Sequence, residues 1–193
     1  MTNPAKEALR REALAWREGL SHEEKAAGEG EMLRRLGALP AWAGADLILT
    51  YYSTPREIDT HGLIAAALGE GRTVALPRCD YQTRRLVFLE YRGEDALMPA
   101  PMALWEPDPR RCPPVTPGAG TLCVVPALAA DGAGLRMGYG GGWYDRFLED
   151  FPGTALALCW DCWRLQKIPA DPWDRPVKLV VTQTGCWPSR ALP

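Results

Sequence analysis

The sequence predicts an α/β fold in which helices cover both faces of a β-sheet. The expected strands are near-continuous apolar runs, which are typical of strands that are buried on both faces. These runs alternate along the chain with segments of helical composition. The chain has 193 residues, a length that fits one domain with a substantial core, and we expect a single domain over residues 1–193.

Four helices are expected from composition and capping signals. The first, residues 4–19, begins with a proline and is rich in Ala, Leu, Glu and Arg. The second, residues 21–37, opens with a capping box, a serine followed three residues later by a glutamate. Shorter helices are expected at residues 60–68 and 143–150.

Six strands are expected, and each is a short apolar run. They comprise residues 46–52, 73–77, 86–91, 122–126, 155–160 and 177–182. The segment from residue 98 to residue 120 contains seven prolines and no clear periodicity. We expect an ordered loop or lid there, because the strand pattern resumes after it.

Charge and composition exclude several classes of function. The formal net charge is −2, so the chain lacks the basic field of a nucleic-acid-binding protein. No apolar run approaches the roughly 18 residues of a membrane span, and the charged N-terminal segment does not resemble a signal peptide. The six cysteines are scattered, and we expect reduced thiols in a cytoplasmic protein.

The segment RMGYGGGWYDR, residues 136–146 and hereafter the glycine segment, holds four glycines within five positions. Glycine permits positive φ and lets a backbone approach a ligand closely, and N–H groups at a helix start favour anions. Arg136 and Arg146 add donors that phosphates accept. A P-loop or a dinucleotide fingerprint does not fit, because the required lysine and third glycine are absent. The alternative is a tight strand-to-helix turn with a structural arginine.

The glycine segment resembles the signature of the 5-formyltetrahydrofolate cyclo-ligases, also called methenyltetrahydrofolate synthetases. Other landmarks occur in the same order along essentially the whole chain. They are Lys6 and Arg10, Tyr52, Glu57 to Thr60, Leu76 and Pro77, Glu106 and Pro107, Val125 and Pro126, Asp131, Gly134 and Thr182.

This resemblance implies a reaction that depends on ATP and Mg²⁺. The formyl oxygen of 5-formyltetrahydrofolate is phosphorylated, the 10-nitrogen closes the ring, and phosphate leaves, which gives 5,10-methenyltetrahydrofolate and ADP. It also implies a three-layer α/β/α domain with a mostly parallel sheet, similar to the sugar-phosphate isomerase and CoA-transferase group.

The resemblance also assigns roles to individual residues. It implies catalytic roles for Arg136 and Tyr144, and a metal ligand at Asp145. The implied ATP-binding residues are Lys6, Arg10, Arg136, Met137, Gly138, Tyr139, Gly140, Gly141, Gly142, Trp143 and Tyr144. The implied substrate-binding residues are Tyr52, Glu57, Tyr139, Gly140 and Gly142.

The sequence departs from the family pattern at two places that bear on the site. Trp143 stands where the family usually has tyrosine, so the position can stack but has no phenol. Lys178 aligns with an acid that some members use as a second metal ligand. Arg17 continues the stripe of Lys6 and Arg10 on the first helix, and its role is left open.

Several alternatives stay open on the sequence. The chain could be another enzyme of the same scaffold, of the isomerase or CoA-transferase type, or a nucleotide- or folate-binding protein without turnover. Cys159 and Cys162 form a lone C-x-x-C pair, which we interpret as structural rather than redox-active or zinc-binding. We expect a small-molecule substrate, no nucleic-acid or membrane partner, and an undetermined oligomeric state with a monomer favoured.

Overall fold

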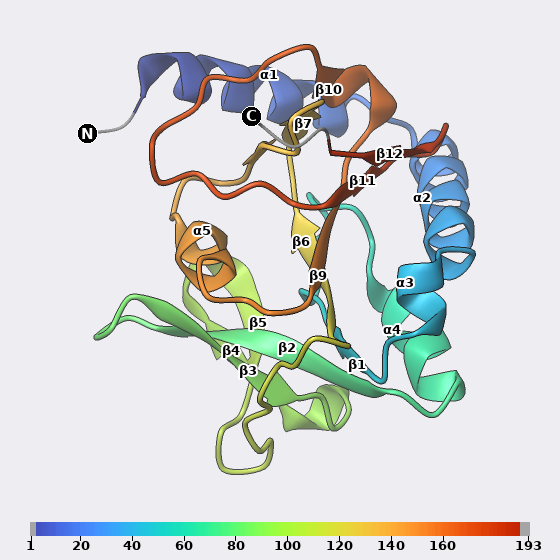
Figure 1. Cartoon of the computed structure of the whole chain (residues 1–193), viewed down its shortest axis with the longest axis vertical. Coiled ribbons are helices and arrows are strands. Elements are labelled where there is room, and N and C mark those ends of the chain that lie inside the picture. Colours follow the sequence, from blue (N-terminus) through green and yellow to red (C-terminus); the bar gives the residue numbers. More distant parts are fainter. Residues whose placement is uncertain (1–2, 190–193) are drawn as a thin grey trace.

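The computed structural model describes residues 3–189 and shows a mixed α/β architecture around a seven-stranded sheet (Figure 1). The strand order is β12-β11-β9-β6-β1-β2-β3. The five inner strands are parallel, and the edge strands β3 and β12 are antiparallel to their neighbours. The prediction of an α/β fold with a mostly parallel sheet is therefore confirmed.

The elements have the following bounds. The helices are α1 (Pro4–Glu18), α2 (His22–Gly37), α3 (Pro40–Ala43), α4 (His61–Gly69) and α5 (Trp143–Leu148). The strands of the main sheet are β1 (Leu47–Leu49), β2 (Thr73–Asp80), β3 (Arg85–Glu90), β6 (Leu122–Pro126), β9 (Thr154–Leu158), β11 (Leu179–Val181) and β12 (Cys186–Pro188). The remaining strands are β4 (Leu97–Ala100), β5 (Leu104–Pro107), β7 (Ala129–Asp131), β8 (Arg136–Met137) and β10 (Arg164–Leu165).

Apolar side chains fill a core on each face of the main sheet. On one face α2, α3 and α4 bury residues such as Leu36 and Leu63 against the inner strands. On the other face α5 packs Phe147 against a core that contains Leu49 and Val125. The alternation of residues along β1 and β6 supplies both cores, which explains why these strands read as continuous apolar runs.

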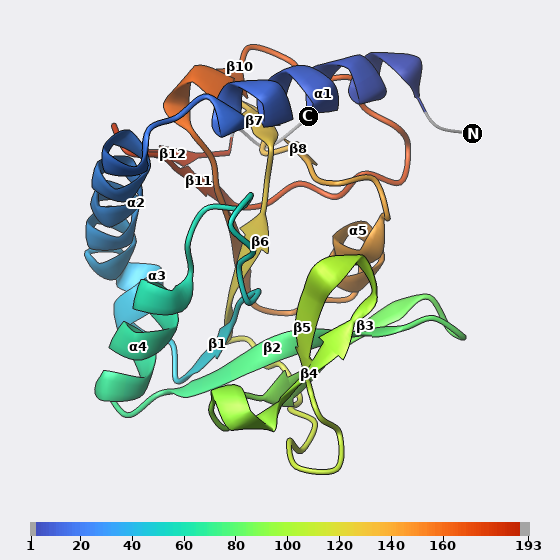
Figure 2. The same ribbon diagram turned by 180° about the vertical axis from the view of Figure 1, so that it is seen from behind.

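The helix α1 lies across one end of the sheet, above the small strands β7 and β8 (Figure 2). A third core joins them, in which Ala13 of α1 packs with Leu128 and Met137. The ends of α1 and α2 follow the predicted caps. In the capping box, Glu24 N donates to Ser21 Oγ at 3.2 Å and Ser21 N donates to Glu24 Oε2 at 2.9 Å.

The structure differs from the sequence predictions mainly in the strands. β1 is shorter than the predicted 46–52, and β2 runs on to Asp80 because it forms a long hairpin with β3. The helix predicted at 143–150 ends at Leu148. The expectation of a loop from residue 98 onward was wrong at its start, since β4 and β5 pair there as a hairpin. Their prolines break the strand pattern that would have predicted it.

The C-x-x-C pair also lies differently from the prediction. β9 ends at Leu158, so Cys159 follows the strand instead of lying within it, and Cys162 lies in a short 3₁₀ turn, Asp161–Trp163. Over residues 3–189, no helix combines the length and the hydropathy that crossing a bilayer would require.

Candidate functional site

The candidate site lies at the carboxyl ends of β1 and β6, where the strand order of the sheet reverses. From β1 the chain proceeds outward to β2 and β3, and from β6 it proceeds in the other direction to β9 and β11. Ligands of open α/β sheets bind in the crevice at such a point. The loop after β1 carries Glu57, the chain after β6 leads to the glycine segment, and α1 contacts both (Figure 1).

Asp131 shapes the turn that leads into the glycine segment. Its Oδ1 accepts hydrogen bonds from the backbone N–H groups of Ala133 at 3.0 Å and Leu135 at 3.1 Å. This turn pairs β7 with β8 and delivers Arg136 and Met137 to buried positions. Met137 packs its side chain into the core under α1, so only its backbone is left to meet a ligand.

Two of the glycines have backbone conformations that residues with a side chain rarely adopt. Gly140 has φ of +99°, and Gly142, the residue that precedes α5, has φ of +64°. A Cβ at Gly140 would lie 3.3 Å from the guanidinium carbon of Arg10. Arg10 Nε also donates to the carbonyl of Gly138 at 2.9 Å. The bare backbone therefore lets α1 and the glycine segment approach each other closely.

Arg136 and Asp145, at the two ends of the turn, form an ion pair. Arg136 Nη1 donates to Asp145 Oδ1 at 2.8 Å and to the carbonyl of Arg175 at 3.1 Å, and the Arg136 side chain is only 4% exposed. The backbone N–H of Arg175 donates to the same Asp145 oxygen at 3.1 Å. Within residues 3–189, no hydrogen bond involves Asp145 Oδ2, so this oxygen remains available to a ligand.

Lys6 is buried on α1 and is held by two aspartates that the sequence analysis did not identify. Its Nζ donates to Asp171 Oδ2 at 2.7 Å and also to Asp174 Oδ2. The hydrogen bond from Lys6 lowers the pKa of Asp171 below its ordinary value. Asp174 precedes Arg175, whose N–H is bonded to Asp145, so one network links α1, the glycine segment and residues 171–175. The only sequence signal was two acids in a proline-rich loop.

Arg146 and Trp143 connect the glycine segment to the hairpin of β2 and β3. Arg146 Nη2 donates to the carbonyl of Gly141 at 3.0 Å, and its Nε donates to the carbonyl of Arg84 at 2.6 Å. Its guanidinium lies 5.2 Å from the centre of the Trp143 ring. Trp143 in turn packs edge-on against Tyr81, with ring centres 5.4 Å apart. The indole at this position therefore packs against Arg146 and Tyr81 and has no phenol to offer.

Glu57 is buried in the loop after β1 and is held by neutral donors. Its Oε2 accepts hydrogen bonds from the backbone N–H of Thr54 at 2.8 Å and from the Thr54 hydroxyl at 3.0 Å. Burial raises the pKa of Glu57, and these hydrogen bonds act in the opposite direction. Tyr139 faces this group from the glycine segment, and burial of its phenol, with the Glu57 charge second, raises the pKa of Tyr139 to about 12.

Tyr52 and Tyr144, both predicted site residues, contact other parts of the molecule. The hydroxyl of Tyr52 donates to Glu94 Oε1 at 3.0 Å, and its ring packs edge-on against His61. Tyr144 packs against the core under α5, and its buried hydroxyl has no hydrogen-bond partner among residues 3–189. Burial raises the pKa of Tyr144 well above its ordinary value. A catalytic role for this hydroxyl would require a ligand to reach it inside the core.

Lys178 lies just before β11 and directly after Val177, whose N–H donates to the carbonyl of Gly134 in the turn before the glycine segment. Its Nζ donates to the carbonyl of Gly153 at 3.2 Å, and its backbone N–H donates to the carbonyl of Ala155. Gly153 immediately precedes β9, so these contacts are at the amino ends of the parallel strands. A lysine ammonium is a hydrogen-bond donor without an acceptor lone pair, so this side chain is not itself a ligand for a metal ion.

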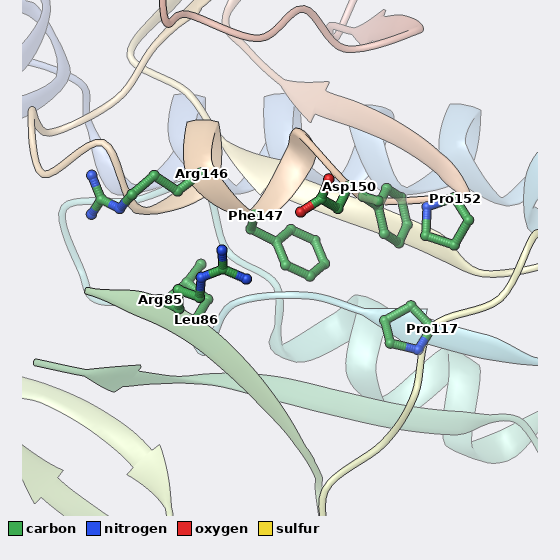
Figure 3. A pocket seen from close by; sticks show the side chains of 8 residues that line it. Arg85, Leu86, Pro117, Arg146, Phe147, Asp150 and Pro152 are labelled. Atoms are coloured by element: carbon green, nitrogen blue, oxygen red, sulfur yellow. The ribbon is translucent and has the colours of Figure 1, made fainter. Parts of the chain in front are cut away.

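Two cavities occur near the site, but neither is lined by the glycines. One of about 300 Å³ lies beneath α5, where Phe147 and Phe151 meet Arg85 and Pro117 (Figure 3). The other, of about 460 Å³, lies between α2 and the loop that begins at Ser53. Each cavity borders a segment that forms the site. The charged groups, however, converge on the glycine segment, and this convergence marks the candidate site.

Cysteines and histidines do not form a metal centre in the part of the chain that the structure describes. Residues 3–189 contain no group of three or more His, Cys, Asp or Glu side chains arranged to hold a metal ion. Cys159 is buried, Cys162 is exposed, and neither is in a disulfide. Burial raises the pKa of Cys159 to about 12, which disfavours the reactive thiolate.

The fold and the site define an α/β protein with a glycine-rich loop where the strand order of its sheet reverses. Arginine side chains flank this loop. Comparison with known proteins identifies the family. The sequence matches the model of the 5-formyltetrahydrofolate cyclo-ligase family over residues 2–183, and the chain belongs to this family.

Individual relatives agree with this assignment. The 5-formyltetrahydrofolate cyclo-ligase of Escherichia coli K12 is 28% identical over 177 residues, which cover 89% of this chain and 96% of the relative. The solution structure of 5,10-methenyltetrahydrofolate synthetase from Aquifex aeolicus is 25% identical, with a TM-score of 0.82 over 97% of this chain and 94% of that one. A synthetase structure from Mycoplasma pneumoniae, at 19% identity and a TM-score of 0.69, covers 92% of this chain and 98% of its own, and supports the fold alone.

Proposed function

We propose that this chain catalyses the ATP-dependent cyclisation of 5-formyltetrahydrofolate to 5,10-methenyltetrahydrofolate, with release of ADP and phosphate. The observation that carries the proposal is the glycine segment at the sheet's switch point, with Gly140 and Gly142 at positive φ between α1 and α5. Membership of the cyclo-ligase family supports the reaction class. The formyl oxygen is a poor leaving group, and its phosphorylation turns it into a good one.

The chain's contribution to phosphoryl transfer is to position groups and neutralise charge. Backbone N–H groups of the glycine segment, with Arg10 beside them, bind the phosphates. Lys6 and Arg136 are each held by carboxylates. ATP binding then exchanges carboxylate for phosphate around two cations that are already in place. Because both cations are buried, this exchange avoids the cost of ordering a long side chain.

Magnesium fits the donors that this network offers. Asp145 has one carboxylate oxygen without a hydrogen bond among the described residues, and Mg²⁺ prefers oxygen ligands while it keeps several waters. We assign Asp145 as the protein ligand, with the carboxylate of Asp174 nearby in the same network. When bound, the ion supplies neutralisation of the charge on the terminal phosphates.

The folate binds on the other side of the switch point. Glu57 offers a buried carboxylate to the donor-rich edge of the pterin ring, and Tyr139, which is 47% exposed, provides an aromatic surface between the two loops. Tyr52 packs its ring edge-on against His61, and we propose that these two rings form one side of the folate pocket.

Further features complete the proposal. We treat residues 1–193 as one domain of a cytoplasmic enzyme whose scaffold is related to the sugar-phosphate isomerase and CoA-transferase group. We propose small-molecule partners, without nucleic acid or membrane, and we favour a monomer. Size-exclusion chromatography with light scattering tests the last point, and a dimer mass would contradict it.

The direct test is the absorbance of the methenyl product. Purified protein with 5-formyltetrahydrofolate, ATP and Mg²⁺ is expected to form 5,10-methenyltetrahydrofolate, and omission of any one component is expected to abolish the signal. A preparation that is folded by circular dichroism but forms no methenyl product would contradict the proposed function.

A further inference from the structure

Arg17, on the last turn of α1, joins the two loops that form the site. The residue is only 7% exposed. Its Nη1 donates to the carbonyl of Arg56 at 3.1 Å, and its Nη2 donates to the carbonyl of Ala127 at 2.9 Å. Arg56 immediately precedes Glu57, and Ala127 is the first residue after β6. One guanidinium therefore spans the switch point of the sheet.

The position of Arg17 distinguishes it from the two other cations of the same helix. At a rise of about 1.5 Å per residue, Arg17 lies roughly 10 Å along the axis from Arg10 and roughly 16 Å from Lys6. Arg10 contacts the glycine segment and Lys6 contacts the aspartates after β10, whereas both terminal nitrogens of Arg17 are bonded to loop carbonyls. Both bonds of Arg17 to backbone go to the two loops, and its guanidinium also lies beside the Tyr139 hydroxyl.

We propose that Arg17 is a positioning residue for the reaction, which holds the loop of Glu57 at a fixed separation from the chain that leads to the glycine segment. The inference rests on the proposed function. The planar fork of a guanidinium suits this task, because it presents two N–H groups at a fixed angle to two carbonyls. A lysine ammonium at the same place has no such fork.

Arg17 also acts on the charge of Glu57. The groups that face this carboxylate are Arg17 from α1, the phenol of Tyr51 after β1, Tyr139 of the glycine segment and Tyr144 of α5, with the Thr54 hydroxyl bonded to it. The three phenols are neutral, since burial raises the pKa of each. Among the described residues, Arg17 is the cation that counteracts the effect of burial on the pKa of Glu57.

The test compares Arg17→Gln and Arg17→Lys with the wild type, and uses Arg11→Gln as the matched control. Arg11 is an exposed arginine of the same helix, and within residues 3–189 its side chain makes no ion pair or hydrogen bond. For each protein, KM for 5-formyltetrahydrofolate, KM for ATP, kcat and the pH profile of kcat/KM for the folate are measured. The thermal unfolding midpoint is recorded alongside.

Arg17→Gln is expected to raise KM for the folate about tenfold, the effect of losing one charge-assisted contact, and to leave KM for ATP within about twofold. Without the cation the pKa of Glu57 rises further, so the acid limb of the pH profile moves to higher pH. Arg17→Lys is expected to return the acid limb towards the wild type while KM for the folate stays raised. Arg11→Gln is expected to match the wild type throughout.

Two outcomes would overturn the inference. An Arg17→Gln protein with a lower unfolding midpoint but unchanged folate KM and acid limb would make Arg17 only structural. A rise in KM for ATP equal to that for the folate would make it a nucleotide contact. If Arg17→Gln does not fold, the folate KM of Arg17→Lys is the deciding measurement. A raised value supports the inference, and an unchanged value overturns it. An inactive wild type would contradict the proposed function instead, so the two failures are distinguishable.

Discussion

The two sides of the candidate site hold their charged groups in different ways. On the side that we propose for the nucleotide, Lys6 and Arg136 are buried, and each is bonded to at least one carboxylate. On the side that we propose for the folate, Glu57 is also buried, but it is held by the N–H and hydroxyl of Thr54, and no ion pair involves it within residues 3–189. Under the proposed function, the two cations exchange carboxylate for phosphate when ATP binds, whereas Glu57 needs no change of ionic partner.

Because of this difference, we expect substitutions on the two sides of the site to have different effects. Breaking one half of a buried ion pair leaves an uncompensated charge, which typically costs about 3–5 kcal/mol of stability. A buried carboxylate with neutral donors responds to pH instead, because protonation relieves its desolvation. Substitutions on the nucleotide side should therefore affect folding and ATP use together, and substitutions on the folate side should affect folate binding and its pH dependence.

The largest effect is expected from Asp145→Asn. The change removes the charge opposite Arg136 and weakens the oxygen that we assign to Mg²⁺. Turnover should fall well beyond tenfold, and the Mg²⁺ concentration for half-maximal rate should rise in a kinetic titration. Asp150 is an exposed acid just beyond α5, and the variant Asp150→Asn serves as the control. A Mg²⁺ titration curve that superimposes on the wild type would leave Asp145 only as the partner of Arg136.

Lys6→Ala and Arg136→Ala should raise the ATP requirement. Each lost charge-assisted contact is worth on the order of 1.5–3 kcal/mol, which corresponds to roughly ten- to a hundredfold in KM for ATP. The folate KM should be spared, because neither side chain contacts the Glu57 loop. Steady-state kinetics at saturating folate measure the effect. An unchanged ATP requirement in either variant would limit that residue to its ion pair.

Glu57→Gln should weaken folate binding without weakening the fold. KM for 5-formyltetrahydrofolate should rise about tenfold, with KM for ATP nearly unchanged. Since burial raises the pKa of Glu57, its contribution to stability is present at acid pH and is lost as pH rises through the raised value. The glutamine variant should therefore gain stability relative to the wild type from acid to neutral pH, as urea unfolding at several pH values would measure. A variant that unfolds more easily at neutral pH would contradict this account of the pocket.

The smallest effect is expected from serine at both Cys159 and Cys162. Neither thiol contacts the glycine segment, and burial raises the pKa of Cys159. Turnover should stay within a few fold, while stability falls modestly because a hydroxyl replaces the buried Cys159 thiol. Zinc analysis of the wild-type protein is the companion measurement. One zinc per chain that the double substitution releases would overturn the structural interpretation.

The sequence predicted the parts of the fold that depend on local signals. The proline and capping box of the first two helices mark their starts, and the apolar runs mark the inner strands, whose burial on both faces leaves little ambiguity. The β4–β5 hairpin and strands β7, β8 and β10 were missed. They contain two to four residues each, too few to leave a periodic pattern in the sequence, and prolines interrupt the pattern of β4 and β5.

The site was predictable to a similar degree. The glycines, Arg10, Arg136 and Asp145 lie together in the structure, as most of them do in the sequence, while their roles stay predictions. The partners of Lys6 were missed because Asp171 and Asp174 are about 165 residues away and carry no motif. The bridge made by Arg17 was also beyond sequence analysis, because its acceptors are two backbone carbonyls.

The most direct test of the central claim is the coupling of ADP release to ring closure. ADP is measured with a coupled enzyme assay, and methenyl product by its absorbance, in the same reaction with and without 5-formyltetrahydrofolate. We predict that ADP forms only when the folate is present, with one ADP for each methenyl product. ADP release at the same rate without the folate, or methenyl product without ADP, would contradict phosphorylation of the formyl oxygen as the driving step.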